Sequence, residues 1–151
     1  MIEGEELASL LPHRGSMLLL TRVNEYNLER RTLCAESHIT EDCLFYDPVI
    51  KGVPAWVAFE FLAQSIAALS GLWSREKGEN PQIGFILSVS SIQIGLPLFS
   101  AGTTVELRLK ENDRMDQVFN FKGEVFLEDR KVMEGKLTVM EVNDEHIKSM
   151  L

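Results

Sequence analysis

The stretch VPAWVAFEFLAQSIAALSGLWSRE, residues 53–76, decides the fold of this 151-residue chain. Wound as an α-helix, it is apolar on almost every side, and Gly78 follows its last turn. A helix that is apolar all round must be surrounded by protein or by lipid. The run is barely long enough to span a bilayer, and Glu60 would be costly in hydrocarbon. We therefore expect a central helix over about residues 53–77, with Pro54 at its first position, inside a folded protein and not in a membrane.

The rest of the chain predicts β-strands in an order that fits one antiparallel sheet. A short helix is expected at residues 3–11, where Pro12 stops it. Strand-like segments lie at residues 17–23, 31–39, 83–94, 103–110, 118–127 and 132–142. Four consecutive strands after a lone helix favour a meander over crossover units. The prediction is a single α+β domain over residues 1–151, with an antiparallel sheet of five or six strands wrapped around one long central helix.

Composition narrows the classes of function. The apolar fraction of 45% and the charged fraction of 25% are those of an ordinary globular domain. The 15 basic and 23 acidic residues give a net charge of −8, and no basic cluster supplies the face that nucleic acid requires. An acidic partner such as an acyl carrier protein, or the phosphates of coenzyme A, would need a local basic patch. The plausible members are Lys51, Arg75 and Lys77, although a solvated surface charge is the favoured interpretation of each one.

The first residues and the cysteines indicate the compartment. Glu3, Glu5 and Glu6 occupy the place where a signal peptide carries positive charge, so we expect a cytoplasmic protein. Cys34 and Cys43 lack the spacing of a metal or redox motif and are interpreted as reduced packing residues. Neither a metal site nor a cofactor is expected.

Two residues of the central helix are candidates for chemistry. Glu60 and Gln64 are four residues apart, so they share one face of an otherwise apolar helix. A carboxyl group in such surroundings is penalised when charged, which suits it to proton transfer near neutral pH. Gln64 is expected to orient Glu60. The backbone amides of Ala55 and Trp56, at the start of the helix, are candidates for polarising a carbonyl oxygen of the substrate.

Three segments together resemble a known family. LLPHRGSMLLLTRV (residues 10–23), VPAWVAFEFLAQ (53–64) and LPLFSAG (96–102) are similar, in the same order, to motifs of the short beta-hydroxyacyl-acyl carrier protein dehydratases. The Pro-Ala-Trp variant looks closest to the dehydratase-like proteins of aryl polyene biosynthesis. The resemblance implies a hotdog fold, a homodimeric unit and elimination of water from a 3-hydroxyacyl thioester, with Glu60 as a catalytic residue.

One position departs from the family pattern. Counted back from Glu60, the family's catalytic histidine falls on Tyr46, which Asp47 and Pro48 follow. A tyrosine hydroxyl holds its proton too tightly to be a good base at neutral pH. Besides Tyr46 itself, the candidates for the base are therefore Asp47 and His13.

Three hypotheses follow from these residues. The chain is a dehydratase acting on a 3-hydroxyacyl thioester of an acyl carrier protein or coenzyme A, a non-catalytic acyl-binding or stabilising partner of an active dehydratase, or a hotdog thioesterase. An oligomer is expected, as a homodimer or larger, or as a heterodimer with an active dehydratase. Trp56, Phe59 and Phe61 could line an acyl tunnel, although aromatic residues on a buried helix are more often part of the core.

Overall fold

The computed structural model describes residues 1–79 and 83–142. The two α-helices are α1 (Gly4–Leu10) and α2 (Ala58–Glu76), and short 3-10 turns cover Gly15–Met17 and Ala55–Val57. The strands are β1 (Ile2–Glu3), β2 (Arg22–Asn27), β3 (Thr32–His38), β4 (Gly52–Pro54), β5 (Ile83–Ile94), β6 (Leu98–Ser100), β7 (Thr104–Met115), β8 (Val118–Leu127) and β9 (Arg130–Val142). The polar tail from Asn143 onward lies outside the described residues.

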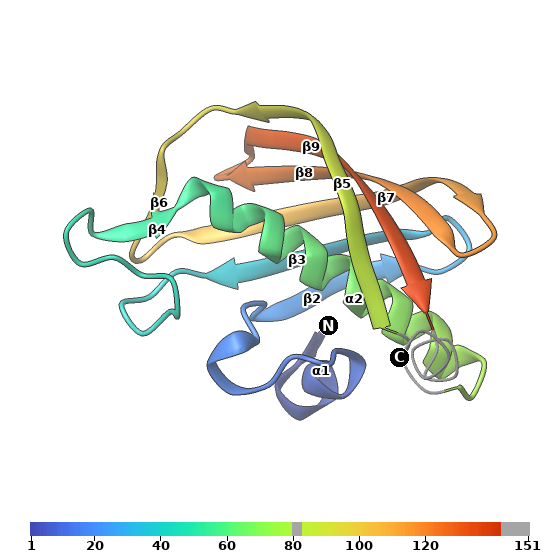
Figure 1. The fold of residues 1–151 in the computed structure, drawn as a ribbon. Coiled ribbons are helices and arrows are strands. Elements are labelled where there is room, and N and C mark those ends of the chain that lie inside the picture. Colours follow the sequence, from blue (N-terminus) through green and yellow to red (C-terminus); the bar gives the residue numbers. More distant parts are fainter. Residues whose placement is uncertain (80–82, 143–151) are drawn as a thin grey trace, which may run out of the picture.

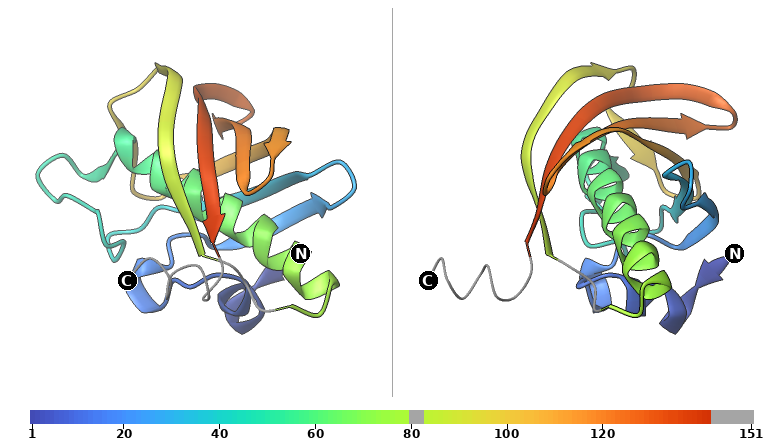
Figure 2. Two further views of the ribbon diagram at one scale, coloured as in Figure 1. Left: turned by 45° about the vertical axis from the view of Figure 1, so that its right-hand side comes forward. Right: turned by 90° about the vertical axis from the view of Figure 1, so that its right-hand side faces the viewer.

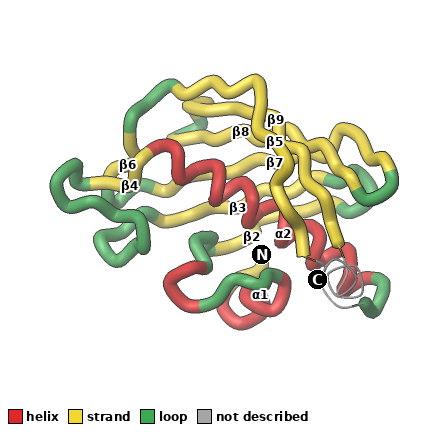
Figure 3. The backbone as a smooth tube through the Cα atoms, in the orientation of Figure 1, coloured by secondary structure: helices red, strands yellow, loops and turns green. Residues whose placement is uncertain are grey.

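One curved sheet wraps around one helix. Seven antiparallel strands run in the order β1-β2-β3-β7-β8-β9-β5, and β4 pairs with β6 in a separate small sheet. The sheet curls around α2, which crosses its concave face, while α1 lies at the end near the chain's start (Figures 1 and 2). The tube view shows how much of the molecule is strand (Figure 3). The predicted α+β hotdog arrangement is confirmed, and the two-residue β1 extends the six expected strands to seven.

Glycines set how closely α2 approaches its neighbours. Gly123 and Gly135 face each other across β8 and β9. A methyl group on Gly123 would lie 2.9 Å from the side chain of Leu62, and one on Gly135 would lie 3.7 Å from the Phe59 ring. On the opposite side, a methyl group on Gly71 would lie 2.2 Å from the backbone oxygen of Leu10 in α1. The helix is therefore held between the sheet and α1.

The central helix begins later than the sequence predicts. Val53 pairs with Phe99 in the small sheet, and Pro54 is extended with φ −53° and ψ 140° instead of opening the helix. The 3-10 turn follows, and α2 begins at Ala58. The apolar character of residues 53–57 thus reflects burial in a strand and a turn. The C-terminal end of α2, at Glu76, agrees with the prediction.

The first predicted strand is also displaced. Met17 lies in the 3-10 turn, and β2 begins only at Arg22. The Gln64 side chain accepts a hydrogen bond from the Leu19 amide and donates one to the Met17 carbonyl, at 2.8 and 2.7 Å. Because a side chain satisfies these backbone groups, the segment is held in place without a strand partner.

The segment Ala55–Glu76 is long and apolar enough to cross a membrane by length and composition alone. In this fold, however, 67% of the most apolar 18-residue stretch of this segment is buried within the protein. The core helix of a soluble protein meets the same criterion, so the segment's hydropathy is accounted for by the sheet that surrounds it.

Candidate active site

Glu60 stands at the edge of the helix–sheet interface. Its neighbours Phe59 and Leu62 face the sheet at the glycine pair, and this orientation turns Glu60 sideways. There it lines a cavity of about 340 Å³ between α2, strands β5 and β9, and the Pro12–His13 segment. Most of the wall is apolar, as expected for a site that accommodates an acyl chain.

His13 is the candidate base that the fold brings to Glu60. Its Nε2 lies 3.5 Å from Glu60 Oε1, and the two side chains are 25% and 37% exposed. Its Nδ1 is buried, with no hydrogen-bond partner within residues 1–79 and 83–142. An imidazole and a carboxyl group at this separation can exchange a proton after a small movement, so the pair can supply both an acid and a base.

Gln64 forms a hydrogen bond with the carboxyl group of Glu60, the group that we expected it to orient. Its Nε2 donates to Glu60 Oε1 at 3.1 Å as well as to the Met17 carbonyl, while its Oε1 accepts from the Leu19 amide. The side chain is completely buried. A fully used, buried amide is a rigid support, so Glu60 is fixed from one side by Gln64 and contacted from the other by His13.

Glu60 is less enclosed than the sequence suggested. With 37% of its side chain exposed in the single chain, the carboxyl group is not in a dry channel. The cause is the sideways orientation, which places it where α2 passes the open edge of the sheet beside Ile86. The prediction of a fully enclosed carboxyl group is therefore wrong for one chain taken alone.

One of the two helix-start amides proposed to polarise a carbonyl is already occupied, while the prediction for the Trp56 amide stays a prediction. The Ala55 amide donates to the Pro97 carbonyl at 3.0 Å, so it is not free to bind a substrate. Trp56 follows in the 3-10 turn and directs a 59% exposed side chain to the solvent, where its ring meets Phe45 edge-on. The cause is the late start of α2, which separates Ala55 from the helix proper.

The other two candidate bases lie elsewhere. Tyr46 and Asp47 belong to the loop that leads into β4. Asp47 Oδ1 accepts a hydrogen bond from the Val49 amide at 2.9 Å and thereby stabilises the turn. Within this single chain, the fold unites Glu60 with His13 and Gln64 but not with Tyr46 or Asp47.

The aromatic residues considered for an acyl tunnel and the lysines and arginine considered for a basic patch lie in different parts of the fold. Phe61 is buried and lines a separate cavity of about 210 Å³ near the helix start, whereas Phe59 packs on the sheet. Lys77 borders a further cavity of about 210 Å³ at the other end of α2. Arg75 instead pairs with Glu6 at 3.7 Å, and Lys51 is exposed in the loop before β4, so the predicted basic patch is not formed by these three residues.

The described residues give no metal centre. Within residues 1–79 and 83–142, no group of three His, Cys, Asp or Glu side chains is arranged to hold a metal ion. Both cysteines are free and half-buried.

The chain matches a known protein family and is similar to several known dehydratases. A family described as ApeP-like, ApeP dehydratase, matches residues 5–151. The chain belongs to the ApeP-like family. Among sequence relatives, the 3-hydroxyacyl-[acyl-carrier-protein] dehydratase FabZ of Chlamydia caviae is 33% identical over 92 residues, which is 59% of each chain. FabZ of Erythrobacter litoralis is 24% identical over 90% of each chain. The ApeP-like chain thus spans about three-fifths of the first of these relatives and most of the second.

Solved structures share the fold. The dehydratase heterocomplex ApeI:P of Xenorhabdus doucetiae matches with a TM-score of 0.87, 21% identity and 95% coverage of each chain. A hypothetical thioesterase of Streptococcus pneumoniae matches less closely, with a TM-score of 0.60, 8% identity, and 81% and 85% coverage. At these identities the structures support the hotdog fold of the ApeP-like chain, while its dehydratase-like character follows from the family and the FabZ relatives.

Two groups of residues that the fold of the ApeP-like chain brings together were not predicted from the sequence. The backbone of Met17 and Leu19 meets Gln64 across more than forty positions, and Arg31 and Arg114 meet Lys77 at the far end of α2. No local spacing connects these residues. They are brought together by the path of the 10–20 segment and by the register of the sheet, which only the folded chain supplies.

Proposed function

We propose that this chain is a dehydratase subunit that eliminates water from a 3-hydroxyacyl thioester, carried by an acyl carrier protein or by coenzyme A. The observation that carries the proposal is the pairing of His13 with Glu60, 3.5 Å apart, beside an apolar-walled cavity. The FabZ relatives, which act on 3-hydroxyacyl thioesters of acyl carrier protein, support this substrate class.

The reaction needs one base and one acid. Neutral His13 removes a proton from C2 of the substrate, and the electron pair forms the C2–C3 double bond. The C3–O bond breaks as protonated Glu60 gives its proton to the leaving hydroxyl, which departs as water. Gln64 holds the carboxyl group in position during the transfer. The products are an enoyl thioester and water.

The proton balance closes within the pair. Elimination leaves His13 protonated and Glu60 ionised, and one proton moving from His13 to Glu60 restores the starting state. No proton is gained from or lost to solvent over the cycle. The 3.5 Å separation of Nε2 and Oε1 makes this reset direct after a small approach of the two side chains.

Purified protein tests the proposal through formation of an enoyl thioester, followed by its ultraviolet absorbance. Glu60→Gln keeps the shape and a hydrogen-bonding group but removes the acid, so we expect kcat to fall by about 10²–10⁴-fold. His13→Gln should lower it similarly. Glu76→Gln, on the exposed last turn of the same helix, is the matched control and should retain activity. Full activity in Glu60→Gln would refute the assignment, and release of free thiol would indicate a thioesterase instead.

A second candidate function has its own support. Tyr46 stands where the family's histidine is expected, and the solved structure with a TM-score of 0.87 is a dehydratase heterocomplex. On this alternative, the chain acts as a partner subunit of an active dehydratase, contributing an acyl-binding half and no base of its own.

The substitution Tyr46→His separates the two candidates. If the isolated wild-type chain is inactive because it lacks this histidine, the Tyr46→His variant should gain dehydration activity. If His13 and Glu60 are sufficient, the wild type is already active and Tyr46→His changes the rate little. Co-purification of an inactive wild type with an active dehydratase would favour the partner function.

A further inference from the structure

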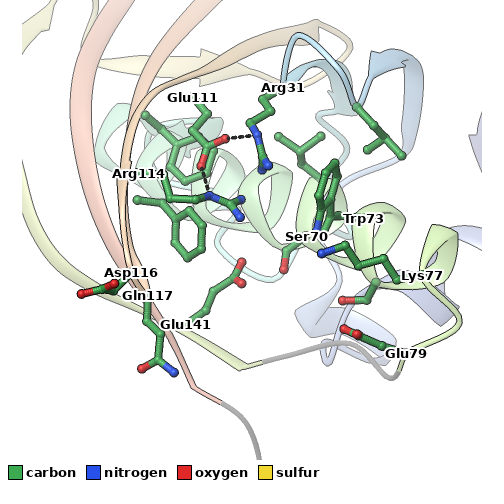
Figure 4. Close-up of a pocket in the computed structure, with 15 residues that line it drawn as sticks. Arg31, Ser70, Trp73, Lys77, Glu79, Glu111, Arg114, Asp116, Gln117 and Glu141 are labelled. Atoms are coloured by element: carbon green, nitrogen blue, oxygen red, sulfur yellow. Dashed lines mark hydrogen bonds and ion pairs between the residues drawn. The ribbon is translucent and has the colours of Figure 1, made fainter.

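A second cavity, of about 210 Å³, lies at the C-terminal end of α2 and contains an unusual gathering of cations. Three positive groups converge on the indole of Trp73: Arg31 Cζ is 4.2 Å from the ring centroid, Lys77 Nζ 4.7 Å and Arg114 Cζ 5.9 Å. Figure 4 shows Arg31 of the turn before β3, Lys77 just after the end of α2, and Arg114 of β7 approaching the same space. Neither the proposed acid–base pair nor the family assignment uses this cluster.

A buried carboxylate fixes the two arginines in one orientation. Glu111, whose side chain is 3% exposed, meets Arg31 Nε at 2.9 Å and Arg114 Nε at 3.2 Å. Arg114 donates a hydrogen bond through Nε to Glu111 Oε1, whereas Arg31 forms an ion pair with Oε2, a buried oxygen that has no hydrogen-bond partner among the described residues. The terminal amino groups of both arginines remain for other partners. In Figure 4 the distal ends of both guanidinium groups lie away from Glu111, toward Trp73 and Ser70.

The cations of this cavity are only partly paired, although four carboxylates line it against three cations. Arg31, Arg114 and Lys77 carry three charges against one on Glu111, and within residues 1–79 and 83–142 no carboxylate forms an ion pair with Lys77. Glu79, Asp116 and Glu141 also line the cavity and oppose an anion. None of these three forms an ion pair with the cations in that part of the chain, so the N–H donors stay available.

We propose that this cavity is a binding site for a small oxyanion, a carboxylate or phosphoryl group, held by the terminal nitrogens of Arg31 and Arg114 and by the Lys77 ammonium. Forked guanidinium donors fixed in advance are the groups that recognise such oxyanions. The Trp73 face packs against whatever chain carries the anion.

The site adjoins the Glu60 cavity. Ser70 and Glu141 line both spaces, and the rise of a helix from residue 60 to residue 70 is about 15 Å. The cations gather at Trp73 and Lys77, so a ligand that contacts both Glu60 and the cations must extend about 20–25 Å along α2. This step rests on the proposed function: the oxyanion is then either a carboxylate at the far end of the acyl chain or the phosphoryl group of the pantetheine arm.

Trp73 provides a direct reporter of binding. The chain has two tryptophans, so Trp56→Phe leaves Trp73 as the sole indole fluorophore. In this background, inorganic phosphate and acetate are titrated at constant ionic strength set with sodium chloride. We expect a saturable change in Trp73 fluorescence for at least one of the two oxyanions.

Two variants test the proposed contacts. Lys77→Met removes a cation that has no ion pair in the described chain, and Arg114→Lys keeps the charge while losing the guanidinium fork. Each should weaken oxyanion binding about tenfold. Arg108→Met, on the same strand but paired with Glu106 and stacked on Phe126, is the matched control and should bind as the parent does. Absence of saturable binding, or equal binding by all variants, would overturn the proposal.

Longer ligands identify the source of the oxyanion. Pantetheine thioesters with a carboxylate-ended or a methyl-ended acyl chain are compared, as are phosphopantetheine and pantetheine. Tighter binding of a charged ligand than of its uncharged counterpart, if it disappears in Lys77→Met, supports the site and identifies the source of the oxyanion. Equal affinity within both pairs of ligands contradicts the link to the Glu60 cavity. Glu60→Gln should bind phosphate as the parent does, so a failed dehydration assay with intact binding would refute the proposed function alone.

Discussion

Gln64 links the structure and the chemistry of the site at the scale of a single residue. Its amide is completely buried and joins three groups: the Glu60 carboxyl, the Met17 carbonyl and the Leu19 amide. A buried backbone group that loses its partner costs more than the hydrogen bond itself contributes. The residue that orients the acid therefore also holds the 10–20 segment against α2.

Substituting Gln64→Leu should accordingly damage stability and not activity alone. The change leaves the Met17 carbonyl and Leu19 amide unpaired, so we expect the free energy of unfolding to fall by about 2–4 kcal/mol, measured by urea denaturation. Gln93→Leu, at an exposed position of β5, is the control and should change stability by less than about 0.5 kcal/mol. A loss below 1 kcal/mol for Gln64→Leu would show that solvent replaces the lost bonds.

Cys34 offers a residue-scale test of burial. Desolvation, reinforced by the nearby Glu25 carboxylate, raises the pKa of the Cys34 thiol from 9.0 to about 11. Because the thiolate is the reactive form, the native protein at pH 8 should react with iodoacetamide about 100-fold more slowly than the unfolded chain. The rate is measured in a Cys43→Ser variant, with the urea-unfolded protein as reference. Native and unfolded rates within threefold of each other would contradict the raised pKa.

At the scale of elements, the contact between α1 and α2 depends on one small residue. Gly71 lies where the two helices meet, and its missing side chain leaves room for the Leu10 carbonyl. A glycine inside a helix is normally a cost, since alanine at such a position stabilises by about 1 kcal/mol. Here close approach of the α1 backbone reverses that preference.

The substitution Gly71→Ala should therefore destabilise by about 1–3 kcal/mol, opposite in sign to its effect in a free helix. Backbone at 2.2 Å cannot move aside without displacing α1. Gly123→Ala is the comparison, because its added methyl meets only the flexible end of Leu62 and should cost less. Thermal denaturation of both variants decides the point, and a stabilised Gly71→Ala would refute the close-packing argument.

How far the sequence predicts each element depends on where the information lies. The end of α2, the strand over 118–127 and the helix–sheet order follow from local periodicity and turn residues, and all agree with the structure. The start of α2 does not, because Val53 pairs with Phe99 nearly fifty positions away. Gln64 beside Glu60 is a four-residue spacing and was predictable. His13 beside Glu60 is a tertiary contact, so sequence reasoning could offer it only as one of three bases.

At the scale of the whole molecule, strand β5 is the exposed edge of the sheet. It carries four large apolar side chains between 42% and 55% exposed: Ile86, Leu87, Ile92 and Ile94. An apolar edge strand of this length offers unpaired backbone groups to another chain, which soluble proteins normally cover. The same edge borders the Glu60 cavity through Ile86. A second subunit placed along β5 would thus both bury the edge and enclose the carboxyl group that one chain leaves 37% exposed.

The double substitution Leu87→Lys and Ile92→Lys should convert an oligomer into a monomer, because two charges would be buried in the contact along β5. Ile86 is left unchanged so that the wall of the cavity keeps its composition. Multi-angle light scattering gives the mass, and Met115→Lys, at a 77% exposed position on β7, controls for added charge. If the partner subunit completes the site, the dehydration rate should fall when the measured molar mass falls to that of a monomer. A monomer with undiminished activity would mean that His13, Glu60 and Gln64 form a complete site within one chain, whereas an intact oligomer would place the interface elsewhere.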